Sequence, residues 1–231
     1  MKRILICGLP GSGKTTLATR LVEVIGNADL YNADEVREKF KDWDFTPEGR
    51  ERQMKRMQDY VRKSVAKDRY GVADFICPTH ELRLKFMPEY VIWMNTIDES
   101  KYEDTNKIFE SPNGLSNVEI TAEDWWTEES VDEMAKLIAV DIKDSEYQSK
   151  FPTTQLLGTF QPFTEDNRKQ FQEALDLNGQ VAVMVRDIPV TLDNPLQVDD
   201  VCKNIEIELV EHAGKFRVYT VPNINHIIQG D

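Results

Sequence analysis

The sequence predicts an α/β protein in which a parallel β-sheet with flanking helices is followed by a smaller Rossmann-like β-α-β-α-β domain. Three observations lead to this prediction. A glycine-rich phosphate-binding pattern stands between an apolar strand and a helix near the start of the chain. Apolar strands then alternate with helices, which is the order of a parallel sheet with right-handed crossovers. After a polar stretch at 143–150 the same alternation begins again.

The phosphate-binding pattern covers residues 8–16 and fits G-x-x-x-x-G-K-[ST], the phosphate loop of P-loop NTPases. Residues 4–7 before it are expected to form a buried strand, and residues 16–22 after it a helix whose N-terminus faces the anion. Lys14 is expected near the β- and γ-phosphates of ATP, and Thr15 is expected to offer its hydroxyl to Mg²⁺. The predicted nucleotide-binding residues are Gly8, Pro10, Gly11, Ser12, Gly13, Lys14, Thr15 and Thr16.

The first part of the chain continues this alternation. Thr46 is a predicted N-cap and Pro47 the first residue of a helix whose apolar residues recur every three or four positions to Val65. Residues 101–109 are charged and carry no clear pattern. The predicted strands are 29–32, 72–77, 90–95 and 118–120, and a closing helix is predicted over 128–142.

The polar stretch at 143–150 lacks periodicity and predicts a boundary between two domains, 1–148 and 153–231. The second domain would be about half of a doubly wound sheet. Its predicted strands are 153–160, 180–185 and 216–221, and its predicted helices are 165–177 and 198–212.

Composition narrows the function classes. The chain has 231 residues, of which 40% are hydrophobic and 30% charged, and its net charge is −13. This charge disfavours a broad nucleic-acid or anionic-membrane surface, and no apolar run approaches the roughly 20 residues that span a bilayer. Cys7, Cys77 and Cys202 are odd in number and far apart, which favours buried thiols in a reducing compartment. With no signal-peptide pattern, the protein is expected to be cytoplasmic.

Asp34 and Arg37 follow the second predicted strand, at the sheet edge where open α/β folds bind ligands. The carboxylate could orient or deprotonate an acceptor hydroxyl or hold a magnesium-bound water, and the guanidinium could bind an anionic substrate. The alternative is a helix N-cap aspartate with a surface arginine.

Together with residues 8–16, three further stretches and one arginine resemble the adenylylsulfate kinase family: 33–37, 45–50, 75–78 and Arg83. The resemblance covers about residues 1–110 and extends thinly to about 145. The family transfers the γ-phosphate of MgATP to the 3′-hydroxyl of adenylyl sulfate. The resemblance therefore implies ATP and Mg²⁺ as cofactors and a small anionic nucleotide as substrate.

The resemblance also implies roles for individual residues. Lys14 and Asp34 would be catalytic, and Thr15 and Asp34 would be associated with Mg²⁺. Phe45 would stack on the adenine of the acceptor, and Lys107 would be a lid cation over the phosphates, although a solvated lysine explains it equally well. The predicted substrate-binding residues are Arg37, Phe45, Arg50, Gln53, Phe75, Ile76, Cys77, Pro78 and Lys107.

Several positions depart from the family pattern. Ala33 and Glu35 flank Asp34 where the family reads Gly-Asp-Asn, and Cys77 replaces a common serine. Gln53 stands in place of a substrate-contacting asparagine, and the lid stretch 104–109 lacks the family's glycine. These changes affect the expected substrate more than the expected chemistry. The alternatives are a polynucleotide 5′-hydroxyl kinase, another small-molecule P-loop kinase, and a nucleotide-binding regulatory protein without enzymatic activity.

In the second domain, residues 158–163 resemble the strand-end signature of nicotinamide-nucleotide adenylyltransferase-like nucleotidylyltransferases. In that family the signature is followed by two histidines and a glycine, and this chain has residues 164–167 in their place. Two of these residues, Glu165 and Asp166, bring negative charge to the position where the family binds phosphate. The domain is therefore expected to be a non-catalytic remnant used as a scaffold or for homo-oligomerisation. Nucleotide binding without turnover, a site shared with another chain, and an ordinary turn at 158–163 are the alternatives.

Overall fold

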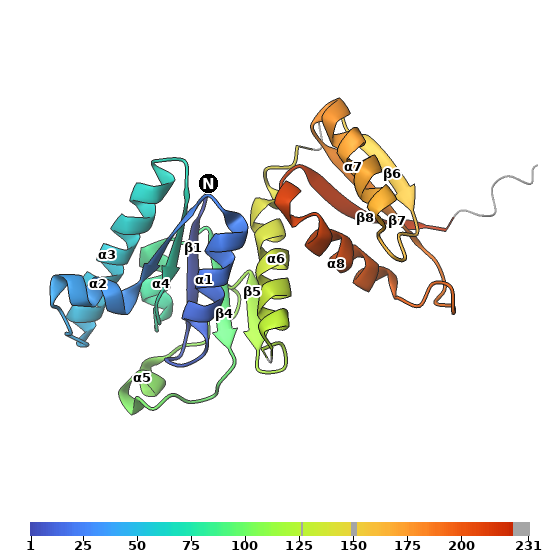
Figure 1. Cartoon of the computed structure of the whole chain (residues 1–231). Helices are drawn as coiled ribbons and strands as arrows, with labels where there is room; N and C mark the ends of the chain where they lie inside the picture. Colours follow the sequence, from blue (N-terminus) through green and yellow to red (C-terminus); the bar gives the residue numbers. More distant parts are fainter. Residues whose placement is uncertain (126, 149–151, 224–231) are drawn as a thin grey trace, which may run out of the picture. The chain divides into compact units, whose positions relative to one another are not determined.

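The computed structural model describes residues 1–125, 127–148 and 152–223. The chain divides into two compact units, residues 1–138 and 139–231 (Figure 1), and each unit is described by itself. Parts of the predicted boundary and of the predicted second domain, at 149–151 and 224–231, lie outside the described residues.

The first unit contains a five-stranded parallel sheet in the order β2-β3-β1-β4-β5. The central strand is flanked on both sides, because Leu5 pairs with Ala73 on β3 and with Val91 on β4. This sheet confirms the predicted fold class. The strands are β1 (Arg3–Gly8), β2 (Ala28–Asn32), β3 (Tyr70–Asp74), β4 (Tyr90–Asn95) and β5 (Val118–Thr121).

Helices cover both faces of this sheet (Figure 1). Right-handed crossovers in this strand order place α1 on one face and the helices between β2 and β4 on the other. On the second face, Met54, Met57 and Val61 of α3 pack against Leu5 and Cys7 of β1. The helices are α1 (Lys14–Ile25), α2 (Ala33–Phe40), α3 (Pro47–Val65), α4 (His80–Phe86), α5 (Glu103–Ile108) and α6 (Glu128–Asp144), the last of which ends in the second unit.

The third strand is shorter than the predicted 72–77. It ends at Asp74, and Cys77 then has a φ angle of 42°, which is not that of a strand. Residues 75–78 therefore form a loop at the carboxyl edge. The N-cap of α3 is Thr46, as predicted, because its side chain accepts a hydrogen bond from Gly49 N.

The second unit contains three parallel strands, β6 (Thr154–Gly158), β7 (Val181–Asp187) and β8 (Phe216–Pro222), in sequential order. The crossover helices are α7 (Glu165–Asn178) and α8 (Val198–Glu208), the latter followed by a 3₁₀ turn at Val210–His212. Because both crossovers run in the same direction, right-handed connections place both helices on one face. This unit has its own apolar core, which includes Phe171, Val183, Ile205 and Phe216.

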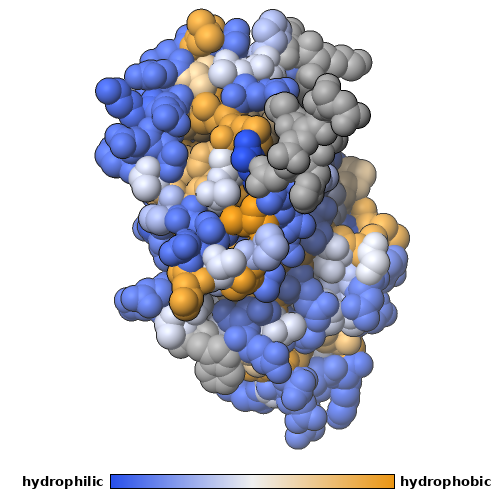
Figure 2. Space-filling model, turned by 90° about the vertical axis from the view of Figure 1, so that its right-hand side faces the viewer, coloured by the Kyte–Doolittle hydropathy of each residue, from blue (hydrophilic) through white to orange (hydrophobic). Residues whose placement is uncertain are grey.

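The surface is predominantly hydrophilic on the face drawn in Figure 2. The chain has 41 acidic and 28 basic residues, and charged side chains separate the apolar ones along most helices. Within the part of the chain that the structure describes, no helix has the length and apolarity needed to cross a membrane.

Candidate active site

The phosphate loop lies between β1 and α1, at the carboxyl edge of the sheet. Gly11 and Gly13 have φ angles of 90° and 88°, in the left-handed region that glycine adopts without strain. Gly13 is also the N-cap of α1, so the free amides at the start of the helix belong to the loop. Of the predicted nucleotide-binding residues, Pro10, Gly11, Lys14 and Thr15 line a large cavity, whereas Gly8, Ser12, Gly13 and Thr16 lie outside its lining.

Lys14 is the cation of this loop. Its side chain is buried, and Nζ donates a 2.7 Å hydrogen bond to the backbone oxygen of Leu9. Burial lowers the pKa of Lys14, and the negative charges of Asp74 and Asp34 act in the opposite direction. A phosphate oxygen would offer the ammonium group a charged acceptor in place of this neutral one.

Asp74 is a site residue that the sequence analysis did not single out. It ends β3 and is 2% exposed. One carboxylate oxygen accepts a 2.6 Å hydrogen bond from Thr15 Oγ1 and a 2.7 Å hydrogen bond from Asn32 Nδ2. The signal that could have found Asp74 is a carboxylate at the end of an apolar strand beside the strand that carries the phosphate loop.

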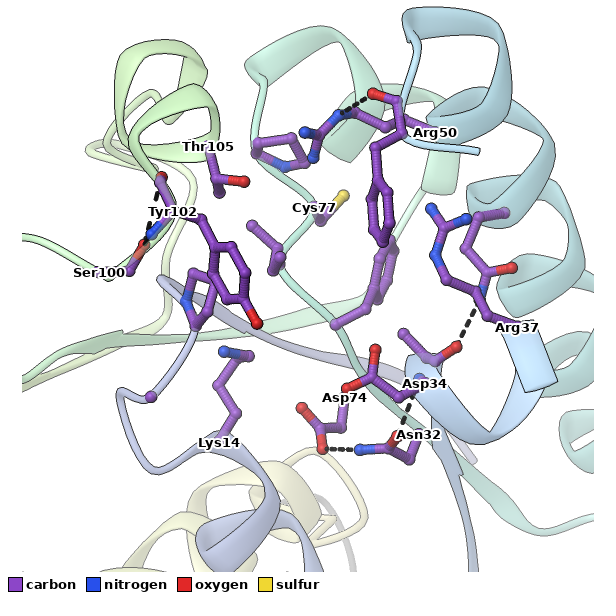
Figure 3. Close-up of a pocket in the computed structure, with 18 of the residues that line it drawn as sticks. Lys14, Asn32, Asp34, Arg37, Arg50, Asp74, Cys77, Ser100, Tyr102 and Thr105 are labelled. Atoms are coloured by element: carbon purple, nitrogen blue, oxygen red, sulfur yellow. Dashed lines mark hydrogen bonds between the residues drawn. The ribbon is translucent and has the colours of Figure 1, made fainter. Parts of the chain in front are cut away.

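Asp34 lies in the first turn of α2 and lines the cavity. It is not the N-cap of this helix, because the Asn32 side chain accepts hydrogen bonds from Asp34 N (2.9 Å) and Glu35 N (3.3 Å). The alternative interpretation of Asp34 as an N-cap is therefore wrong. The carboxylate is exposed and faces the cavity together with Asp74 and Lys14 (Figure 3).

Two guanidinium groups contact Phe45, which lies in the loop between α2 and α3. The Cζ atoms of Arg37 and Arg50 lie 4.5 and 5.7 Å from the centre of the Phe45 ring. Arg37 is buried and donates to the backbone oxygens of Asp42 (2.9 Å) and Asp44 (3.0 Å). Burial lowers the pKa of Arg37. These contacts hold Phe45 in place, with about half of its side chain exposed.

The remaining predicted substrate-binding residues of α3 and the β3–α4 loop also line the cavity. Gln53 is buried, and its Nε2 donates a 2.9 Å hydrogen bond to Ala33 O, which fixes α3 to the start of α2. The thiol of Cys77 is buried, and burial raises its pKa well above the usual value. The lining residues from this group are Gln53, Phe75, Ile76, Cys77 and Pro78.

Arg83 lies behind the cavity rather than in its lining. Its side chain is 1% exposed, and Nη2 donates to the backbone oxygens of Pro78 (3.0 Å) and Glu110. The guanidinium lies 5.3 Å from the centre of the Phe109 ring. Arg83 therefore supports the β3–α4 loop and the chain after α5.

Lys107 is not brought to the cavity. Its side chain is 76% exposed, and Nζ lies 3.8 Å from a carboxylate oxygen of Glu103 on the same helix. The cation that this part of the chain places in the cavity lining is Lys101. The structure therefore gives no support to Lys107 as a phosphate contact.

The cavity has a volume of about 1080 Å³. Figure 3 shows Lys14, Asp34 and Asp74 at one end and Arg50 and Thr105 at the other. The phosphate-loop end carries one ammonium group and two carboxylates, and the opposite end combines arginines with aromatic rings. The two ends of the cavity therefore differ in their chemistry.

The pair of Thr15 and Asp74 fits Mg²⁺. Their side chains offer oxygen atoms at the phosphate loop and share a hydrogen bond, and Asn32 Nδ2 donates to both of them. Among the described residues, no group of three or more His, Cys, Asp and Glu side chains could hold a metal ion alone. Mg²⁺ is commonly bound by one or two carboxylates together with water and substrate phosphates.

The five-stranded parallel sheet with flanking helices and the phosphate loop after β1 form the P-loop NTPase-type fold that the sequence predicted. A family model described as an AAA domain matches residues 4–87, from β1 to the end of α4. Among solved structures, APE1195 is similar with a TM-score of 0.51 and 22% identity, over 59% of this chain and 93% of that chain.

Two further solved structures are similar. The APS kinase CysC of Mycobacterium tuberculosis with AMPPNP and APS has a TM-score of 0.46 and 17% identity, over 59% of this chain and 94% of that one. An unliganded sugar kinase from Janibacter sp. HTCC2649 has a TM-score of 0.49 and 13% identity, over 59% of this chain and 93% of that chain. No curated protein matches the chain.

In the second unit, the loop after β6 is closed by its own side chains. Phe160 has a φ angle of 51°, and a Cβ built on Gly158 would lie 2.9 Å from the Phe160 ring. Thr164 caps α7 in a reciprocal pair with Asn167. The first turn of α7 contains Glu165 and Asp166.

Proposed function

We propose that the first unit is a kinase that transfers the γ-phosphate of MgATP to a hydroxyl group of a small anionic nucleotide. One observation carries this proposal. A single cavity joins Lys14, Thr15 and Asp74 at the phosphate loop to Asp34 and to the Phe45 ring with its two arginines.

The phosphate-loop end would bind ATP. Lys14 would contact the β- and γ-phosphates, and Thr15 and Asp74 would hold Mg²⁺, directly or through water. Bound Mg²⁺ neutralises charge on the phosphates. The hydrogen bond between Thr15 and Asp74 orients both oxygens before the ligand enters.

The other end would bind the acceptor. Asp34 would orient its hydroxyl and accept its proton, while Phe45 offers a ring for stacking on a base. The acceptor oxygen forms a bond to the γ-phosphorus, the bond from phosphorus to the β-phosphate oxygen breaks, and ADP leaves. Such a reaction depends mainly on positioning and charge neutralisation.

Adenylyl sulfate is the proposed acceptor, with phosphorylation at the 3′-hydroxyl to give 3′-phosphoadenylyl sulfate. The support is the sequence resemblance at residues 33–37, 45–50 and 75–78 together with the position of these stretches around the cavity. We further propose that the second domain does not turn over nucleotides. The Phe160 ring against Gly158 and the acidic first turn of α7 support this.

The direct test is transfer of labelled phosphate from ATP to adenylyl sulfate or to an oligonucleotide with a 5′-hydroxyl, in parallel reactions. We expect 3′-phosphoadenylyl sulfate from the parent protein and none from Lys14→Ala. Lys67→Ala, an exposed lysine after α3, is the matched control and should keep full activity.

Other outcomes select the other functions. Labelling of the oligonucleotide alone would identify a polynucleotide 5′-hydroxyl kinase. Labelling of neither acceptor, with tight ATP binding that Lys14→Ala abolishes, would leave another small-molecule P-loop kinase or a nucleotide-binding regulatory protein as the function.

A further inference from the structure

Residues 97–109, which join β4 to the chain after α5, form one wall of the cavity. Lys101, Tyr102, Asp104 and Thr105 line it from this side. The wall is fixed at its start, where the neighbouring Thr96 Oγ1 donates a 2.8 Å hydrogen bond to Ser12 O in the phosphate loop.

The same wall is fixed at its end and stiffened inside. After α5, Glu110 N donates a 2.8 Å hydrogen bond to Pro78 O. Within the segment, Ser100 Oγ donates to Asn106 Oδ1 (2.6 Å), and Asn106 Nδ2 donates to Ser100 O (2.8 Å). The first turn of α5 therefore has a defined position opposite α3.

An ion pair crosses from this wall to the acceptor end of the cavity. Arg50 Nη2 donates to Asp104 Oδ2 at 3.1 Å, and Arg50 Nε donates to Phe45 O at 2.8 Å. The Arg50 side chain is 10% exposed and that of Asp104 is 68% exposed. Solvent thus reaches the carboxylate far more easily than the guanidinium.

The two arginines at this end differ in what a ligand could replace. Arg37 is bound by backbone oxygens of its own loop, which cannot leave without unfolding it. Arg50 is bound by a side-chain carboxylate on a separate element. An anion that approaches Arg50 must displace Asp104 or lie beside a like charge.

We propose that Asp104 competes with the anionic group of the acceptor for Arg50. In the free protein the Asp104 carboxylate neutralises the Arg50 guanidinium. An anionic group of the acceptor would displace this carboxylate, whereas a neutral acceptor of the same shape would gain no ion pair with Arg50. The proposal rests on the proposed function, because it assumes that the Arg50 end holds the acceptor.

Calorimetric titration with AMP and with adenosine tests the proposal, because these probes share base and sugar and differ in the anion. The protein is first saturated with Mg²⁺ and a non-hydrolysable ATP analogue, so that the probes report on the acceptor end. In Asp104→Asn we expect AMP to bind about 2- to 5-fold more tightly, as for release of an exposed ion pair, and adenosine to bind unchanged.

Glu103→Gln is the matched control, since this exposed carboxylate in the same turn pairs with Lys107 and not with Arg50. It should leave both affinities unchanged. An Asp104→Asn protein that binds AMP equally or more weakly, or that binds adenosine more tightly by the same factor, would overturn the proposal.

The titration tests the role of Asp104 independently of the proposed kinase reaction. If AMP binding responds to Asp104→Asn but no acceptor is phosphorylated, the competition for Arg50 stands and the kinase reaction is wrong. If neither probe binds, both the acceptor end and the role of Asp104 are wrong.

Discussion

Asp34 and Asp74 both face the cavity, and the proposed function gives them different tasks. Asp74 is buried and bound to the Thr15 hydroxyl at 2.6 Å, next to the phosphate loop. Asp34 is exposed at the start of α2, and its backbone rather than its carboxylate takes part in the cap. A buried carboxylate on a threonine hydroxyl suits a metal, whereas a freely exposed one suits an acceptor hydroxyl.

Asp74→Asn and Asp34→Asn should therefore have different kinetic effects. Asp74→Asn should weaken Mg²⁺-dependent ATP binding on the order of 10- to 100-fold, because a magnesium-associated carboxylate is lost. Asp34→Asn should keep ATP affinity and lower kcat about 10²- to 10⁴-fold, as for loss of a general base. Nucleotide titration with Mg²⁺ and with EDTA, followed by steady-state kinetics, measures both.

Two results would contradict this division. An Asp74→Asn protein whose ATP affinity equals that of the parent protein, both with Mg²⁺ and with EDTA, would show that Asp74 does not hold the metal. A kcat of the Asp34→Asn protein equal to that of the parent protein would show that Asp34 is not the general base.

The site residues that the sequence predicted are those on the phosphate loop and those with charged or aromatic side chains in the resembling stretches. The sequence analysis missed Asp74 because its strand was predicted to continue to Cys77. Asp74 was therefore not expected at the carboxyl edge of the sheet, where β3 ends. Lys101 was not recognised in place of Lys107, because nothing in a charged segment specifies which of its lysines lines the cavity and which stays in solvent on the short helix α5.

At the scale of elements, α3 and β3 pack without an intervening side chain. Gly71 on β3 is buried, and a Cβ built on it would lie 2.7 Å from Val61 Cα and 2.8 Å from Val61 O. These two atoms belong to the backbone of α3, and the third neighbour, Val61 Cβ, is attached directly to it. None of them is the end of a flexible side chain that could move to make room. Gln53 and Arg50 of the cavity lie on the same helix as Val61.

Gly71→Ala should therefore lower the free energy of unfolding by about 1–3 kcal/mol, because α3 must shift outward. Equilibrium denaturation measures the loss. Gly26→Ala is the comparison, because its Cβ would have nothing within 4 Å and only its φ angle of 77° is unfavourable. Parent-like stability and acceptor affinity in Gly71→Ala would show that α3 moves without consequence.

The sequence predicted the long elements best. The start of α3 was readable because Thr46 and Pro47 form a local cap signal. The short helices α4 and α5 were missed because seven and six residues hold too few apolar positions to show a period. Tertiary contacts, such as Arg83 under the β3–α4 loop, stabilise them instead.

At the scale of the whole molecule, each unit has its own apolar core and its own parallel sheet. The sequence predicted the restart of the β-α alternation after 150, because apolar periodicity is a local property. It could not show how the loop after β6 closes. That depends on the φ angle of 51° at Phe160 and on the placement of its ring against Gly158.

The two units should respond differently to nucleotide. Saturating Mg²⁺ with a non-hydrolysable ATP analogue should slow amide exchange in the phosphate loop and in the ends of β2 and β3, because ligand binding stabilises the structure that it contacts. Exchange in β6, β7 and the start of α7 should stay unchanged. Lys14→Ala should abolish the slowing in the first unit. Protection at residues 158–166 that survives Lys14→Ala would show instead that the second unit binds nucleotide by itself.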